Sequence, residues 1–454
     1  MKLIKDILKV FNSNVLMLLS NIILSIFLPL SLSVDEFGEY RKYILYISYI
    51  AIFNLGYIDG IFIKYGGKNL EDNKKSLRAE HKFLVIFQLI VTIILICISV
   101  LEKDILLLLI SLSIIPINVN GFHKMLYQST GLFTKYSRIN ILFTIFNLIF
   151  IGCLLVLKID NSSYYIAATL IANILLLLIV EYDFYKLVGG IRNDLKINYL
   201  YYFKVGIFIL AGNFSILLFN NIGLWIVNFF FSIKEFAQYS FATSMLNMIL
   251  LGVSSVGLTF YNYLARNEDK QMVKLTTKIL IILGIIAGCI FFILKLFISK
   301  ILPHYSASLD IIAVSFVNLP YIMVINVILI NLYKARKQEK KFFLIVVTML
   351  FISTILNFIS FIIFHSLTLI ALATTISYII WFLACTNIDF KYLKSDWTQL
   401  FVLSVHFVVF LACSNYLNWA IGLLIYSGVV LILMFIFYKQ DFLKLINMVK
   451  KVRN

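Results

Sequence analysis

Apolar stretches of membrane-spanning length follow one another along this chain with few interruptions. A transmembrane helix needs about 20 predominantly apolar residues, within a range of about 17–25. Fourteen stretches are long enough to cross a membrane: residues 11–33, 37–63, 83–101, 104–127, 136–157, 164–185, 203–231, 237–264, 279–299, 307–333, 342–364, 367–388, 399–415 and 418–438. Hydrophobic residues make up 62% of the chain and charged residues 13%, which would leave a water-soluble globule without enough polar surface. The sequence therefore predicts an all-α polytopic membrane protein with about 14 transmembrane helices.

The basic residues predict which way these helices run. Most of the 39 Lys and Arg residues lie in every second connection, on the same side as Lys2, Lys5 and Lys9. Because short, positively charged loops remain in the cytoplasm during insertion, both termini are predicted to be cytoplasmic. The net charge of +17 follows from this orientation and does not indicate a nucleic-acid partner.

The chain repeats itself after six spans. Residues 34–40, with the sequence VDEFGEY, match residues 233–239, with the sequence IKEFAQY, at an offset of 199 residues that continues through the following helices. A second match pairs Leu126-Tyr127 with Leu332-Tyr333 at an offset of 206 residues. An even number of spans separates the matched segments, so the two copies have the same orientation in the membrane.

This repeat predicts the domain organisation. We expect two pseudo-symmetric six-helix lobes, residues 1–195 and 196–392. An additional two-helix segment and a basic cytoplasmic tail follow at residues 393–454.

The motifs of common enzyme classes are absent from the sequence. It contains no P-loop, no GxGxxG, GxSxG or HExxH motif, and no Cys or His spacing typical of a metal site. The connections on the outer side are too short to hold the extracytoplasmic domain that envelope polymerases and glycosyltransferases usually need. We therefore expect no enzymatic activity, no metal and no cofactor.

The segment that contains the first copy of the repeat resembles a known family. The outer loop DEFGEY, the helix that carries residues 54–60 (NLGYIDG) and the basic connection after it are similar to the polysaccharide-transporter branch of the multidrug/oligosaccharidyl-lipid/polysaccharide (MOP) exporter superfamily. The six-plus-six-plus-two plan extends the resemblance over essentially the whole chain. It implies a Wzx-type flippase of the bacterial cell (inner) membrane.

Such a flippase moves polyprenyl-pyrophosphate-linked oligosaccharide repeat units from the cytoplasmic to the outer leaflet by alternating access. The units supply O-antigen, capsule or related glycan export. The resemblance also implies membrane lipid, a glycan polymerase and other envelope-synthesis proteins as partners.

Polar residues in the seventh stretch are candidates for sugar binding, because proteins of this plan line their cavity mainly with spans one, two, seven and eight. These candidates are Asn213, Asn220, Asn221, Trp225 and Asn228. Amides offer both donors and acceptors, and an aromatic ring offers a flat apolar surface for a sugar. The alternative is that the amides form hydrogen bonds between helices, which is common in membranes.

Charged residues at span ends are candidates for binding the diphosphate. Arg41 lies near the outer end of the second stretch, Lys64 and Arg266 lie at predicted cytoplasmic ends, and Lys295 lies about one turn inside the ninth stretch. The alternative for each is a role in orientation, or snorkelling of the side chain to the membrane surface.

Asp59 is the acidic candidate, because it lies within an apolar span between Gly56 and Gly60. We expect it either to pair with Lys64 or to take up H⁺ or Na⁺ as a coupling ion. The alternative is a structural role.

Three other functions stay open. A cation-coupled drug antiporter of the same superfamily has the two lobes but usually only twelve spans. A peptidoglycan-precursor (lipid II) flippase has fourteen spans but typically carries arginines in its first helix, where this chain has Asn12, Asn14 and Asn21. A non-transporting scaffold for envelope-synthesis enzymes is the third.

Overall fold

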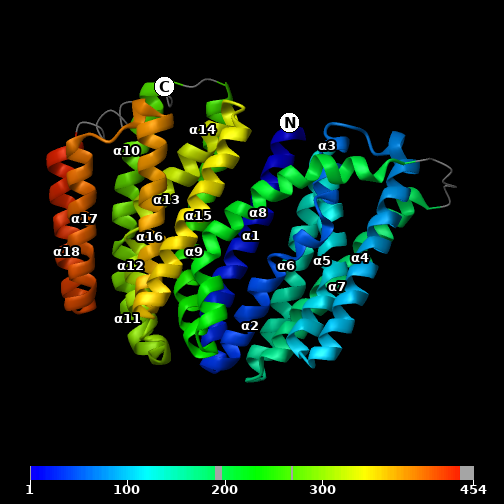
Figure 1. The fold of residues 1–454 in the computed structure, drawn as a ribbon, viewed down its shortest axis with the longest axis horizontal. Coiled ribbons are helices and arrows are strands. Elements are labelled where there is room, and N and C mark those ends of the chain that lie inside the picture. The colour runs from blue at the N-terminus through cyan, green and yellow to red at the C-terminus, as the bar shows by residue number, and fades with distance from the viewer. Residues whose placement is uncertain (1, 190–196, 267–268, 440–454) are drawn as a thin grey trace. The chain divides into compact units, whose positions relative to one another are not determined.

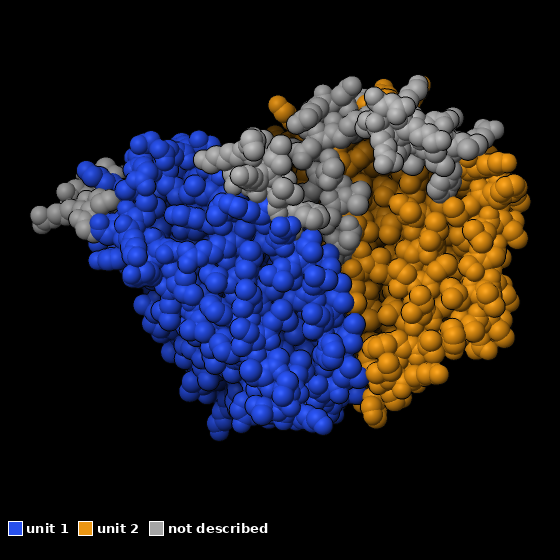
Figure 2. Space-filling model, turned by 180° about the vertical axis from the view of Figure 1, so that it is seen from behind, with its two compact units in different colours: residues 1–217 blue, residues 218–454 orange. Residues whose placement is uncertain are grey.

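The computed structural model describes the backbone of residues 2–189, 197–266 and 269–439, and their side chains except those of 2–8, 11 and most of 251–266. All regular secondary structure within these ranges is helical. The chain divides into two compact units, residues 1–217 and 218–454 (Figure 2). The boundary between them falls within the long helix α8, Tyr199–Phe230.

Among its described residues, unit 1 contains seven complete α-helices and the first part of α8 (Figure 1). The seven are α1 (Lys2–Ser31), α2 (Val34–Ile47), α3 (Tyr57–Tyr65), α4 (Lys74–Glu102), α5 (Ile105–Ser129), α6 (Phe133–Val156) and α7 (Ser162–Val188).

In the part of unit 2 that the structure describes, the rest of α8 is followed by ten further α-helices. They are α9 (Ile233–Arg266), α10 (Lys270–Ala287), α11 (Cys289–Ile301), α12 (Ser308–Phe316), α13 (Leu319–Val324), α14 (Ile330–Ala335), α15 (Glu339–Phe364), α16 (Leu367–Ala384), α17 (Trp397–Tyr416) and α18 (Trp419–Leu433). Short π-helical segments extend α16 to Asp389 and α18 to Tyr438.

Each of the fourteen predicted stretches coincides with one helix or with consecutive helices. Among the described residues, 11 helices are long and apolar enough to cross a membrane, and two bent helix pairs raise the number up to 13. Helix α9 covers the eighth stretch. The all-α polytopic fold is therefore confirmed, while the cytoplasmic position of the termini stays a prediction.

Short polar side chains set where several helices begin. Asp104 accepts the amide proton of Leu107 at 3.0 Å, and Asn418 accepts that of Ile421 at 2.9 Å. These are N-cap interactions, which satisfy backbone donors that the first helical turn leaves free.

Three of the spans are bent or divided within the described residues. The second span bends by 65° between Asn54 and Tyr57, the tenth bends by 50° between Phe316 and Leu319, and the ninth divides at Gly288. Apolar length predicts that a segment crosses the membrane, but it does not report local backbone conformation.

The core of unit 1 is rich in aromatic side chains. Tyr57, Tyr65, Phe122, Phe184 and Tyr202 belong to one buried cluster that joins α3, α4, α5, α7 and α8. This cluster surrounds α3, the part of the second span that follows the break.

Candidate functional site

The break in the second span is a left-handed turn. Leu55 and Gly56 have φ angles of 50° and 82°, and the Gly56 amide donates to Asn54 Oδ1 at 2.9 Å. Glycine adopts this conformation at little cost, whereas another residue loses about 1–2 kcal/mol. Contacts with neighbouring helices must therefore hold Leu55 in place.

Two buried amide side chains replace hydrogen bonds that the turn removes. Gln88 of α4 donates to the carbonyl of Phe53 at 3.1 Å. Asn118 of α5 donates to Gln88 Oε1 at 2.7 Å and to the carbonyl of Ile50 at 3.4 Å. Backbone groups that leave a helix inside a bilayer must find protein partners, so these amides make the break a stable part of the fold.

Glycines allow α3 to cross α8 in direct backbone contact. A Cβ atom at Gly60 would overlap the backbone of Tyr202, and one at Gly206 would overlap the carbonyl of Gly56. Only glycine fits such a close approach. The crossing fixes the short helix that follows the turn.

Asp59 lies in the first turn of α3, directly after the break. The residue is 8% exposed, and its carboxylate makes no ion pair and no hydrogen bond to another described residue. A helix N-terminus favours a negative charge, but a carboxylate within a membrane is costly unless it is neutralised or hydrated. These are the surroundings expected of a group that takes up H⁺ or Na⁺; that role stays a prediction.

Lys64 pairs with Glu80 of α4, so the predicted pair between Asp59 and Lys64 is wrong. Glu80 is fully buried and also accepts the hydroxyl protons of Tyr202 at 2.6 Å and Tyr65 at 2.7 Å. Lys64 donates to the Tyr202 hydroxyl at 2.7 Å. The sequence analysis missed Glu80 because it precedes the third apolar stretch. The cluster ties α3 to α4 and α8, which is a structural role for Lys64.

The candidate residues of span seven lie on α8 in different surroundings. The exposed side chains are those of Asn213 and Asn220, and the half-buried ones are those of Asn221, Trp225 and Asn228. Asn220 Oδ1 accepts the hydroxyl proton of Tyr378 at 2.8 Å, which is the interhelical bond considered as the alternative. The Trp225 ring stacks on Phe229 with centroids 5.5 Å apart. Sugar binding by these residues stays a prediction.

The structure describes the side chains of two of the three remaining basic candidates. Arg41 is half-buried in α2, and the side chain of Arg266, the last residue of α9, lies outside the described residues. Lys295 of α11 donates to the carbonyls of Ser414 at 2.6 Å and Leu417 at 2.8 Å. Since these carbonyls lie at the end of α17, Lys295 caps that helix.

One polar cluster was not expected from the sequence. Nε2 of His81 and Nε2 of His123 each lie 2.7 Å from Glu181 Oε1, which joins α4, α5 and α7. The three ligand atoms lie within 4.8 Å of one another, so the group has the composition of a metal-binding set. The histidines lie 100 and 58 residues from Glu181 in the sequence, and a search for short metal motifs does not detect such a group. The expected absence of a metal therefore stays a prediction.

The fold is similar to a solved structure described as "Lipid II flippase MurJ, inward closed conformation". The TM-score is 0.69 and the sequence identity 17%, over 96% of this chain and 99% of that chain. No protein-family model matches the sequence, and no curated protein matches it. The likeness shows that nearly all of this chain shares the fold of that solved structure.

Proposed function

We propose that this protein is a flippase that moves polyprenyl-pyrophosphate-linked oligosaccharide repeat units across the bacterial cell (inner) membrane. The observation that carries the proposal is the fold, which matches a lipid II flippase over almost the full length of both chains. Residues 34–40 and 54–60, which resemble polysaccharide transporters, support an oligosaccharide as the cargo.

A polar path explains why such a cargo needs a protein. Sugar hydroxyls and a diphosphate are costly to place in hydrocarbon. Asn213, Asn221, Trp225 and Asn228 are the proposed sugar contacts. Alternating access would expose them to one leaflet at a time.

The diphosphate would be bound by basic side chains. Arg41 and Arg266 are its proposed contacts. Lys64 and Lys295 already bind protein groups, which favours structural roles for both. Asp59 is the proposed site of the coupling ion, H⁺ or Na⁺.

A lipid II flippase is the second candidate, and the described activity of the structural neighbour favours it. The first helix argues for the oligosaccharide cargo, because residues 10–31 contain no charged side chain. A drug antiporter and a non-transporting scaffold are the further alternatives.

Reconstitution tests the cargo directly. The purified protein would be placed in liposomes that contain either a fluorescent polyprenyl-pyrophosphate-linked oligosaccharide or fluorescent lipid II, and a membrane-impermeant quencher would report the rate at which each lipid changes leaflet. Arg41→Gln is the test variant, and Lys234→Gln, an exposed residue in the first turn of α9, is its matched control.

We expect fast exchange of the oligosaccharide lipid, slow exchange of lipid II, and a rate that falls about tenfold or more in Arg41→Gln only, because Arg contacts to phosphate are strong. Faster exchange of lipid II would assign the protein to the second candidate. Exchange of neither lipid would remove the flippase proposal.

A further inference from the structure

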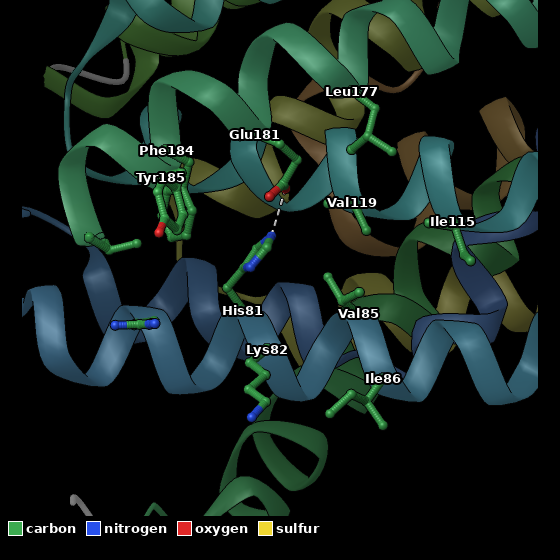
Figure 3. Close-up of a pocket in the computed structure, with 12 residues that line it drawn as sticks. His81, Lys82, Val85, Ile86, Ile115, Val119, Leu177, Glu181, Phe184 and Tyr185 are labelled. Atoms are coloured by element: carbon green, nitrogen blue, oxygen red, sulfur yellow. Dashed lines mark hydrogen bonds and ion pairs between the residues drawn. The ribbon is translucent and has the colours of Figure 1, made fainter. Parts of the chain in front are cut away.

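Histidines lie within the spans of both units, and they differ in what their ring nitrogens face. In unit 1, Nε2 of His81 and Nε2 of His123 each lie 2.7 Å from the Glu181 carboxylate. Figure 3 shows His81 and Glu181 pointing toward each other from facing helices. A carboxylate only accepts hydrogen bonds, so a neutral ring with its proton on Nε2 satisfies each contact, and the carboxylate keeps its negative charge. This cluster needs no further proton.

His406 of unit 2 has an oxygen atom beside each of its ring nitrogens. It lies in the middle of α17 and is 1% exposed. Its Nε2 lies 3.3 Å from the carbonyl of Val317, and its Nδ1 lies 2.9 Å from the hydroxyl of Tyr426 in α18. The same hydroxyl donates to the carbonyl of Ile285 at 2.6 Å. Three contacts therefore connect His406 and Tyr426 to two backbone carbonyls.

These three contacts use one more proton than the neutral side chains carry. A carbonyl oxygen only accepts, and the single proton of the Tyr426 hydroxyl goes to Ile285. The hydroxyl must then accept from Nδ1 of His406, while Nε2 must donate to Val317. A neutral imidazole has only one N–H group, so in one of its two contacts a nitrogen lone pair faces an oxygen lone pair. An imidazolium donates from both nitrogens and makes all three hydrogen bonds.

Both carbonyls lie where a span is interrupted. Ile285 lies in the last turn of α10, just before the division of the ninth span, and Val317 lies in the bend of the tenth span. Pro320 explains that bend, because it has no amide proton and its ring clashes with the carbonyl four residues earlier. Backbone groups beside a break inside a membrane depend on donors from the protein. Tyr426 and His406 supply such donors to these two carbonyls.

The two interrupted spans touch each other at their breaks and also touch the last two helices. A Cβ atom at Gly284 would overlap the backbone of Pro320, and one at Gly288 would lie 2.7 Å from the Tyr426 hydroxyl. The Phe410 ring, one turn after the histidine on α17, lies 5.2 Å from the Tyr426 ring between centroids. Because the breaks pack this closely, a proton on the histidine acts on both of them.

The helices around His406 carry their charges away from it. Helices α13, α17 and α18 contain no Asp, Glu, Lys or Arg. On α10, α11 and α12 the charged side chains closest to the breaks lie about two helical turns away along the chain: Lys278, Lys295 and Asp310. The titratable side chains nearer to the breaks are neutral at physiological pH: Cys289, Tyr321, Cys413 and Tyr426.

The charge of an imidazolium at His406 is therefore met by two oxygen atoms and not by an ion pair. A charge inside a membrane is costly unless polar groups surround it. The ring consequently holds a second proton only while both oxygen atoms stay in place.

We propose that His406 and Tyr426 form a proton-binding site that holds the breaks of the ninth and tenth spans to the last two helices. The proton comes from water and binds to the ring nitrogen that lacks one. Movement of either break removes an acceptor and releases the proton. Proton binding and the conformation of the two spans are thus linked: the proton binds more tightly to this conformation, so a lower pH favours it. The site is separate from Asp59 and does not depend on the identity of the cargo.

Solid-state ¹⁵N NMR of the full-length protein in lipid bilayers tests this proposal. Labelled histidine gives signals that distinguish neutral rings from imidazolium, and the signal of His406 is the one that His406→Asn removes. Hydrogen exchange of residues 285–289 and 317–321, corrected for the intrinsic effect of pH, reports on the two breaks. Tyr426→Phe is the second variant. The matched controls are His304→Asn and Tyr416→Phe, which replace exposed residues of unit 2.

The pH is lowered from about 8 to about 5, the range in which histidine usually titrates. We expect His406 to change from neutral to imidazolium. Exchange at both breaks should slow about tenfold or more, because a hydrogen bond from a charged donor replaces a repulsive contact. The pH response at the breaks should disappear in His406→Asn and Tyr426→Phe and should remain in both controls.

Three outcomes would overturn the proposal. They are a His406 ring that stays neutral over this range, exchange at the breaks that does not change when the ring takes up its proton, and an equal pH response in a variant and its control. The response of the unaltered protein is measured without any variant, and thermal unfolding midpoints verify that each variant is folded. Lipid exchange is measured separately, so failure of the flippase proposal leaves this test intact.

Discussion

The second and eighth spans begin with matching sequence segments but continue differently. Both follow the repeated segment at residues 34–40 and 233–239. The second span breaks at Leu55–Gly56 and turns by 65°, whereas the eighth continues as one helix, α9, to Arg266.

The residues at matching positions explain the difference. At the offset of 199 residues, Gly56 corresponds to Ser255, Asp59 to Leu258 and Gly60 to Thr259. The second copy thus lacks the glycine of the turn, the glycine of the helix crossing and the acidic side chain between them. The repeat predicts the number and direction of the helices in each copy, whereas residues found in one copy only predict where that copy is specialised. Four changes test whether the break, its supports and Asp59 form one such specialised site.

The largest loss of stability is expected from Glu80→Leu, which removes the support of the helix after the break. Lys64, 23% exposed in its side chain, would lose its ionic partner, and the hydroxyls of Tyr65 and Tyr202 would lose an acceptor. Removing one member of a buried ion pair costs about 3–5 kcal/mol. The thermal unfolding midpoint of the purified protein measures the loss.

The double variant Lys64→Leu/Glu80→Leu is the control for this experiment. Replacing both members of a buried pair by apolar side chains is often close to neutral. Unfolding at the wild-type temperature in the single variant would show that Glu80 does not hold α3 in place.

A smaller loss of stability is expected from Gly60→Ala, which tests the close crossing of α3 and α8. The added methyl group would overlap the backbone of Tyr202, and overpacking of this kind typically costs about 1–3 kcal/mol. Gly121→Ala is the matched control, because a Cβ there meets no atom within 4 Å and alanine is the better helix former by about 1 kcal/mol. The unfolding temperature should fall in Gly60→Ala and rise in Gly121→Ala. Equal shifts in the two variants would argue against a tight crossing.

The sequence predicted the helices of this site better than its contacts. Apolar length was sufficient to locate every span, because crossing a bilayer requires it. Gly56 and Gly60 were visible as glycines, but nothing in the pattern showed that they face Gly206, which lies in another span. Glu80 was missed because it lies outside the apolar stretches, and His81, His123 and Glu181 come from three separate helices. Contacts between distant segments depend on how helices pack, which a single sequence does not report.

A loss of stability similar to that of Gly60→Ala is expected from Gln88→Leu, which removes the amide that supports the turn. The carbonyl of Phe53 and the amide of Asn118 would each lose a partner, and an unsatisfied buried polar group costs about 1–3 kcal/mol. Thr92→Val, one turn further along α4, is the control, because its buried hydroxyl has no hydrogen-bond partner among the described residues. Hydrogen exchange at residues 50–56 should rise in Gln88→Leu only; unchanged exchange would mean that the turn does not depend on this amide.

The smallest effect on stability, and the most specific effect on function, is expected from Asp59→Leu. This change places in the second span the residue type that the eighth span has at the matching position, Leu258. Because the carboxylate of Asp59 has no partner among the described residues, its removal leaves no other group unsatisfied, and a stability change within about 1 kcal/mol is expected.

If the carboxylate takes up H⁺ or Na⁺ during transport, lipid exchange in liposomes should no longer respond to a gradient of that ion in Asp59→Leu, while exchange without a gradient continues. Asp72→Asn, an exposed acidic residue in the connection before α4, should keep the full response. A gradient response that persists in Asp59→Leu would assign coupling to another residue. The acidic side chain of the second span would then have a purely structural explanation, because a negative charge is favourable at the start of α3.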